Sequence, residues 1–155
     1  MPVVSNSSPL IALAAIERLE LLPALFKSVL IPPAVAQEIT RSIPVPPVWL
    51  SMKALGTGLP TVVLRRTLAD GEREAIALAI ELRAYLIILD DLPARRVAKA
   101  AGLNVIGAVG VLLGAKRVGL IDRLRPELDN LLTHSFFLSP QLYDELLHVA
   151  GELDR

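Results

Sequence analysis

The chain has 155 residues, 53% of them hydrophobic and 4% aromatic, and its sixteen basic and sixteen acidic side chains cancel. This length suits a single domain, residues 1–155, with a core of Leu, Ile, Val and Ala, which is typical of parallel sheets covered by helices. The lack of cysteine excludes disulfides, thiolate nucleophiles and cysteine-based zinc sites and fits a cytoplasmic protein, while the zero net charge gives no general attraction for nucleic acid.

The first half of the chain predicts alternating strands and helices. "VVS" at 3–5 predicts a strand, and the helical pattern that follows has Ser7 or Ser8 as N-cap and Pro9 in its first turn. The next expected elements are a helix at 19–26, a strand at 28–32 and a helix at 32–42. Residues 42–60, rich in Pro and Gly, predict a loop or partly extended segment, and "TVVLRR" at 61–66 predicts a short edge strand.

The second half continues this alternation. "DGEREAIALAIELRA" at 70–84 is the clearest helix, with acids in its first turn, and "YLIILDD" at 85–91 is a buried strand that ends in two aspartates. The remaining predicted elements are a helix at 93–101, a strand at 103–107, and helices at 108–121, near 122–132 and at 139–150. We therefore expect an α/β fold with a parallel sheet, in which the C-terminal helices at 122–150 belong to the same domain.

Uncharged stretches do not predict a membrane segment. Residues 1–16 lack the basic leader of a signal peptide, and "GLNVIGAVGVLLGA" is shorter than the ~20 residues of a membrane span. The mean hydropathy of +0.54 is high. It indicates either a deep α/β core or an apolar surface covered by a second subunit, as in a homodimer, or by another protein.

Acidic side chains are predicted to gather at one rim of the sheet. The carboxyl ends of parallel strands lie on one edge, so Asn6, Asp90 and Asp91 should emerge there. Glu74 lies among apolar residues near the start of the 70–84 helix, and Glu38 is flanked by Val35 and Ile39 on one helical face. An acid in such surroundings usually marks a partner or an ion.

Crowded carboxylates repel one another and need a cation. Oxygen ligands without thiolates suit Mg²⁺ or Mn²⁺, which can lower the pKa of water and neutralise a phosphate, so the pattern points to phosphodiester hydrolysis. Asp70 and Glu72 fit first-turn helix acids instead. Arg95 and Arg96 form either a solvated helix face or, beside the acid rim, a phosphate contact.

These residues together resemble the PIN-domain family, especially its toxin-like subgroup that opens with a "VVSxxSPLI" segment. The matching segments are, in order, "VVSNSSPLIALAAIERLELLP", "IPPAVAQEI", "LADGEREAIALA" and "LIILDDLPARRVAKAAGLNVIGAVGVLLGAKRVGLI". The resemblance implies a three-layer α/β/α sandwich with a central parallel sheet and an acidic pocket for Mg²⁺ or Mn²⁺. It also implies a metal-dependent ribonuclease, in many members a toxin neutralised by a small antitoxin protein.

The resemblance also implies roles for individual residues. Asn6 stands where many members have their first catalytic aspartate, and Glu38, Glu74 and Asp91 match the other acids, with Asp90 able to exchange roles with Asp91. Ser7 or Ser8 would assist at the first acid. The expected metal ligands are therefore Asn6, Glu38, Glu74, Asp90 and Asp91, and the expected RNA contacts are Ser7, Ser8, Arg95 and Arg96.

Asn6 leaves alternative functions open. An amide offers a carbonyl oxygen but no charge and no base, so metal affinity should fall relative to an aspartate. The leading hypothesis is a metal-dependent endoribonuclease with RNA and an antitoxin as partners. The second is a weakened or inactive module that binds a protein. A receiver-like domain lacks the acid pair expected after its first strand, and a serine hydrolase lacks the G-x-S-x-G elbow.

Overall fold

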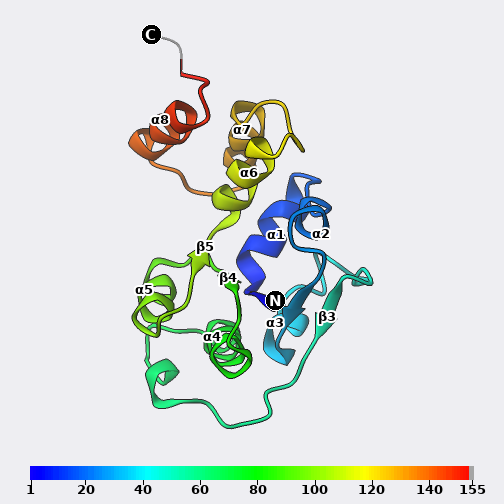
Figure 1. The fold of residues 1–155 in the computed structure, drawn as a ribbon, viewed down its shortest axis with the longest axis vertical. Helices are drawn as coiled ribbons and strands as arrows, with labels where there is room; N and C mark the ends of the chain where they lie inside the picture. The colour runs from blue at the N-terminus through cyan, green and yellow to red at the C-terminus, as the bar shows by residue number, and fades with distance from the viewer. Residues whose placement is uncertain (154–155) are drawn as a thin grey trace.

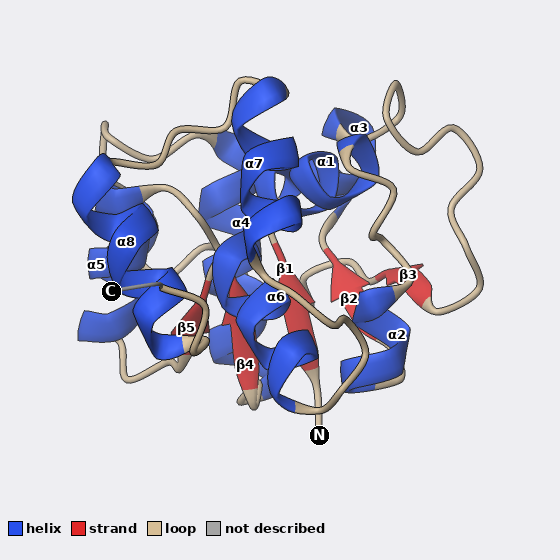
Figure 2. Cartoon of the chain, turned by 90° about the horizontal axis from the view of Figure 1, so that it is seen from above, coloured by secondary structure: helices blue, strands red, loops and turns tan. Residues whose placement is uncertain are grey.

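The computed structural model describes residues 1–153, in which five parallel strands form one central sheet. The strands are β1 (Val3–Ser5), β2 (Val29–Ile31), β3 (Leu50–Met52), β4 (Leu86–Ile88) and β5 (Val105–Ile106). Their order is β3-β2-β1-β4-β5, which Figure 2 shows across the middle of the molecule. β1 lies at the centre, and the chain leaves it toward β2 and later returns to its other side as β4.

Helices cover both faces of the sheet, as the sequence predicted. The helices are α1 (Ser7–Ala15), α2 (Leu21–Phe26), α3 (Pro33–Glu38), α4 (Asp70–Leu82), α5 (Leu92–Ala100), α6 (Ala108–Arg117), α7 (Arg125–Thr133) and α8 (Pro140–Val149). α1, α2 and α6 pack together on one side of the sheet, and α4 and α5 lie on the other, with α3 against α4 (Figure 1). The expected three-layer α/β/α sandwich is confirmed.

Aliphatic side chains from all layers form one core. Val4, Ile87 and Ile88 in the central strands are fully buried, and Leu128 of α7 and Leu147 of α8 belong to the same hydrophobic cluster. Strands that are apolar on both faces are expected where helices cover both sides of a sheet. None of the helices within residues 1–153 is long and apolar enough to cross a membrane.

The predicted edge strand at 61–66 is wrong. Thr61–Val63 forms a short 3₁₀ helix in which Val63 N donates to Pro60 O. The edge strand next to β2 is instead β3, within the segment expected to be a loop or partly extended, and it pairs with β2 from Val29↔Leu50 to Ile31↔Met52. Only Leu50 of this strand is buried, so an edge position leaves little hydrophobic pattern for the sequence to reveal.

The predicted helix cap is also wrong by one or two residues. Asn6, not Ser7 or Ser8, occupies the N-cap position of α1, and its side chain makes no capping hydrogen bond. Asn6 N donates to Ile88 O at 2.9 Å, which continues the pairing of β1 with β4 beyond Ser5. The strand therefore runs directly into the helix, and Asn6 is the junction between them.

Candidate functional site

Asn6 lies at the carboxyl end of the central strand, where the order of strands reverses. It follows β1, and Asp90 and Asp91 follow the neighbouring β4, with Ser5 and Ile88 in register. Parallel α/β sheets bind ligands outside the carboxyl ends of their strands at such a reversal. The parallel strands thus bring the backbone of all three residues to one rim of the sheet.

The Asn6 side chain is buried without a partner. Only 2% of the residue is exposed, and its Oδ1 makes no hydrogen bond within the described part of the chain. A buried polar atom left unpaired costs about 1–3 kcal/mol, so such atoms call for an explanation. This oxygen is suited to accept a hydrogen bond or to coordinate a cation.

Glu38 reaches the same region from the end of α3. Its Oε1 accepts a hydrogen bond from Ser7 Oγ at 2.9 Å. On its other side the carboxylate lies against Gly71 in the first turn of α4, and a Cβ at that position would overlap Glu38 Oε1. Ser7 and Gly71 therefore determine where the Glu38 carboxylate can lie.

Glu72 is the second carboxylate of the cluster. Burial raises its pKa above the ordinary value, a hydrogen bond from Ala69 N opposes this, and repulsion from the Asp91 and Glu38 carboxylates adds to the increase. The Ala69 bond, 2.7 Å to Oε1, is half of a capping box, because alanine has no side-chain oxygen to complete it. Glu72 thus caps the start of α4 and also lies close enough to two other acids to interact with their charges.

Asp91 is the third carboxylate. It is the N-cap of α5, where Oδ2 accepts from Ala94 N at 3.0 Å. In residues 1–153 neither Asp91, Glu38 nor Glu72 forms an ion pair with Lys, Arg or His. The three carboxylates therefore concentrate negative charge at the rim of the sheet where β1 ends.

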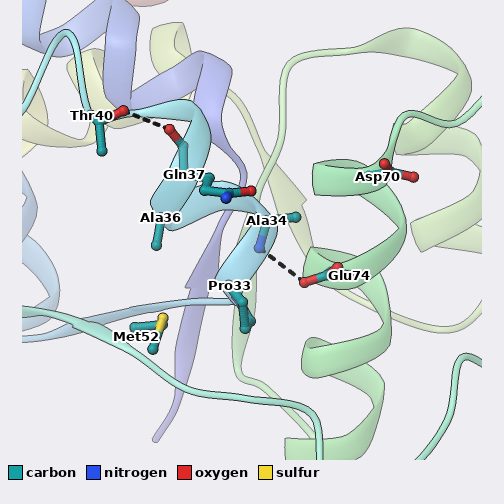
Figure 3. Close-up of a pocket in the computed structure, with 8 residues that line it drawn as sticks. All are labelled: Pro33, Ala34, Ala36, Gln37, Thr40, Met52, Asp70 and Glu74. Atoms are coloured by element: carbon teal, nitrogen blue, oxygen red, sulfur yellow. Dashed lines mark hydrogen bonds between the residues drawn. The ribbon is translucent and has the colours of Figure 1, made fainter.

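Glu74 does not join this cluster. Its Oε1 accepts from Ala34 N at 3.0 Å at the opposite end of α3, and Figure 3 shows the side chain directed at that backbone. It lines a separate cavity of about 560 Å³ with Pro33, Met52 and Asp70. In this structure Glu74 anchors the start of α3, and Glu72 lies where Glu74 was expected.

Asp90 also turns away, toward α6. Its Oδ1 accepts from Ala108 N at 2.9 Å, and this approach requires Gly107, because a Cβ there would overlap the same oxygen. Burial raises the pKa of Asp90, whereas the Ala108 hydrogen bond and Arg95 lower it. Asp90 Oδ2 is buried with no partner among the described residues. Asp90 therefore joins β4 to α6.

The predicted RNA contacts lie in different surroundings. Ser7 is engaged by Glu38, whereas Ser8 is exposed beside a cavity of about 690 Å³ that Glu72 and Asp91 also line. Arg95 lines this cavity, and its Nη1 donates to Leu89 O at 2.9 Å. Arg96 is exposed on the same helix. Ser8 and Arg96 are thus accessible, and Ser7 and Arg95 already have protein partners.

Comparison with known proteins identifies the family to which this fold belongs. A family profile described as a PIN domain matches residues 2–152. The chain belongs to the PIN-domain family. PIN domains are generally a nuclease fold and typically use a divalent metal. The expected family resemblance is confirmed.

One solved structure supports the fold of this PIN domain. A PilT N-terminus domain protein from the hyperthermophilic archaeon Sulfolobus solfataricus P2 superposes with a TM-score of 0.57 at 22% identity, covering 74% of this chain and 93% of that chain. At this identity the likeness concerns the fold alone. A search of curated proteins gave no significant match.

The donor atoms of this PIN domain suit a divalent cation. Asn6 Oδ1 has no partner, and each of Glu38, Glu72 and Asp91 uses one carboxylate oxygen in the hydrogen bonds above and leaves the other for a ligand. An all-oxygen set of this kind matches the ligand preference of Mg²⁺ and Mn²⁺. Within residues 1–153 no three Asp, Glu or His side chains are already arranged to hold a metal. The fit is one of chemistry, and binding would draw the carboxylates together.

Glu72 is the residue that sequence reasoning assigned to a helix terminus alone. The available signal was the glycine before it, because "DGE" in a first turn leaves space on α4 for another acid to approach. An acid at N3 can cap its own helix and still direct its second oxygen outward. The two roles are compatible in Glu72.

Proposed function

We propose that this PIN domain is a metal-dependent endoribonuclease whose cation, Mg²⁺ or Mn²⁺, is held by Asn6, Glu38, Glu72 and Asp91. The observation that carries the proposal is that three carboxylates without ion-pair partners gather at the rim of the sheet where β1 ends in Asn6, whose buried Oδ1 has no partner. When bound, the metal would neutralise charge on a phosphate and make water a better nucleophile.

The protein's own groups set the geometry around that charge. Ser7 holds one Glu38 oxygen, Ala69 N holds one Glu72 oxygen and Ala94 N holds one Asp91 oxygen, so each carboxylate is oriented before a ligand arrives. Cation binding would still draw the free oxygens together, because within residues 1–153 no three of these acids are already arranged around one point. In this proposal Arg96 and Ser8 contact the RNA backbone, which their exposure supports.

The test separates the two neighbouring glutamates of α4. Single-stranded RNA is incubated with the wild type, Glu72→Gln and Glu74→Gln, with Mn²⁺, with Mg²⁺ and with EDTA. We expect metal-dependent cleavage by the wild type and by Glu74→Gln, and loss of cleavage in Glu72→Gln. Cleavage that survives Glu72→Gln, or that proceeds equally in EDTA, would contradict the proposal.

A second candidate function follows from Asn6. A neutral amide in place of an acid favours a protein-binding module with a weakened metal site. This candidate predicts no Mn²⁺-dependent rise in the melting temperature of the wild type. A clear Mn²⁺-dependent rise in the melting temperature of the wild type that is absent in Glu72→Gln would exclude this second candidate function.

The proposal includes a toxin role with a small antitoxin as partner, and a homodimer. Exposed apolar side chains such as Leu64 and Val118 support a covering protein. Induced expression in bacteria should arrest growth in the wild type and not in Glu72→Gln, and sedimentation should give the mass of a dimer. Normal growth despite soluble, RNA-cleaving protein would remove the toxin role while leaving the nuclease.

A further inference from the structure

The cavity beside the acidic cluster is lined by both charged and apolar side chains. Its lining includes the acids Glu72, Asp90 and Asp91 and the apolar link between α7 and α8, with Phe136 to Leu138. Its volume of about 690 Å³ exceeds what water alone requires and suits a small organic group. Because Glu72 and Asp91 belong both to the cluster and to this cavity, the two spaces are continuous.

Phe137 stands out among the apolar lining residues. It is 85% exposed, whereas Leu138 after it is buried and Phe136 before it packs against the core. Because its two neighbours in sequence are held by the core, the backbone at Phe137 is fixed while its side chain remains in solvent. Leu92, which directly follows Asp91, is 64% exposed at the same cavity. The core does not need the Phe137 ring, which leaves its face free for a ligand.

We propose that this cavity binds a nucleobase of single-stranded RNA, stacked on Phe137, next to the phosphate that lies at the acidic cluster. This inference rests on the proposed function for its substrate class. It adds a base subsite and a preference for unpaired RNA, since a base within a duplex cannot stack on a side chain.

Charge favours a base over the RNA backbone as the group inside the cavity. Three acids and one arginine line it, so a bare phosphate would be repelled, whereas a base is neutral and planar. Arg95 is already bonded to Leu89 O, and Arg96 lies outside on the exposed face of α5. The backbone can therefore follow α5 while the base turns toward Phe137.

The experiment measures binding separately from cleavage. Fluorescence anisotropy of a labelled single-stranded oligoadenylate is recorded on the protein with its full ligand set, with Ca²⁺ in place of Mg²⁺ because Ca²⁺ also takes oxygen ligands, and the strand is recovered intact afterwards. Phe137→Ala should weaken binding about five- to a hundredfold, the range that one base–aromatic stack supplies. Phe137→Trp should retain affinity, and Phe137→Leu, which keeps the apolar volume but not the ring, should lose most of it.

Matched controls isolate the stack. Val48→Ala removes an equally exposed apolar side chain near the opposite, β3 edge of the sheet and should leave affinity unchanged. A series of oligonucleotides is prepared in which each member lacks the base at one different position. One member should bind the protein that retains Phe137 as weakly as the intact strand binds Phe137→Ala. Phe137→Ala should bind this abasic strand and the intact strand with equal affinity. Duplex RNA should bind more weakly than the single strand in the Phe137 protein.

Several outcomes would overturn the base subsite. These are no detectable oligonucleotide binding, equal binding by Phe137→Ala, or a Phe137→Leu variant as good as Phe137→Trp. A wild-type dimer that Phe137→Ala converts to monomer would assign the surface to a second copy of the chain. Cleavage that is independent of Phe137 would remove the subsite alone, whereas Phe137-dependent binding without cleavage in the wild type would remove the nuclease alone.

Discussion

The carboxylate of Glu38 lies against the Cα of Gly71, in a space that any larger residue at position 71 would fill. About one helical turn away, the Glu74 carboxylate accepts from Ala34 N. These two contacts show that α3 and α4 run antiparallel, with one acid from each helix reaching across to the other. The contact of Glu38 with Gly71 lies in the acidic cluster, whereas the hydrogen bond from Ala34 N to Glu74 stabilises the start of α3. The same pair of helices therefore supports the fold and positions a residue of the candidate site.

Gly71→Ala should change metal binding more than stability. Alanine favours a helix by roughly 1 kcal/mol over glycine, and the Glu38 carboxylate, the end of an exposed side chain, can swing away from the new methyl group. We expect the free energy of unfolding to stay within about 1 kcal/mol. Mn²⁺ affinity by calorimetry should fall about tenfold, because a residue that positions a ligand is lost.

Gly114→Ala is the matched control within α6. A Cβ there meets nothing within 4 Å, so this variant should gain the same helix propensity, about 1 kcal/mol, with unchanged Mn²⁺ affinity. Equal Mn²⁺ affinity in the two glycine variants would mean that Gly71 does not position Glu38.

Glu74→Ala should destabilise the fold without affecting the metal. It leaves Ala34 N without its acceptor, at a cost of about 1–2 kcal/mol. Glu74→Gln keeps an acceptor oxygen and should cost less. Urea unfolding measures both, and Mn²⁺ titration should give the wild-type affinity for each. A Glu74→Gln variant that folds normally but no longer binds Mn²⁺ would return Glu74 to the ligand set.

The exchange of Glu72 and Glu74 shows where sequence reasoning ends. The sheet rim was predictable, because parallel strands bring Asn6 and Asp91 together whatever the side-chain details. The phase of α4 was not. Residues two apart on a helix point about 200° apart, and the burial of every residue from Ala75 to Ala79 leaves no polar face to fix that phase.

Asp90 was ambiguous for a different reason. An aspartate after a buried strand can bind a ligand or accept from a backbone N–H, and only the tertiary fold brings Ala108 N to it. Gly107, in sequence merely the residue before a helix, is what makes that approach possible.

Asp90→Asn should be at least as stable as the wild type at pH 7. Burial raises the pKa of Asp90 in the folded protein, so its ionised form opposes folding once the pH exceeds the ordinary aspartate value of 3.8. Asparagine is never charged and keeps an acceptor for Ala108 N. Urea unfolding should show the variant's advantage at pH 7 shrinking toward pH 3. A variant less stable than the wild type at pH 7 but not at pH 3 would mean that the charge of Asp90 stabilises the fold.

Glu152 should make the fold sensitive to acid. Burial raises its pKa, but hydrogen bonds from Lys116 Nζ, Leu124 N and Arg125 N outweigh this and lower the pKa to about 2. Because the pKa of Glu152 is lower in the folded protein, its ionised carboxylate stabilises the fold at pH values above the unfolded pKa of 4.5. This stabilisation is lost as the pH falls toward 2. The loss is about 3 kcal/mol. Glu152→Gln should be less stable than the wild type at pH 7, and its free energy of unfolding should change less between pH 5 and pH 2. Unfolding measured at a series of pH values tests this. Equal changes of the free energy with pH in the two proteins would contradict this role.

Asn6→Asp should make the protein more dependent on metal. A carboxylate in this buried position, near Glu38, Glu72 and Asp91, adds repulsion and desolvation, so in EDTA the variant should melt below the wild type and lose more stability as the pH rises. With Mn²⁺ the added charge faces a cation, and affinity should rise about tenfold or more. Because a ligand of the folded state stabilises in proportion to its affinity, melting curves over a Mn²⁺ series should cross, with the variant lower without metal and gaining more with it. If the two proteins keep a constant difference at every Mn²⁺ concentration, the position-6 side chain does not contact the cation, and its unpartnered oxygen needs another explanation.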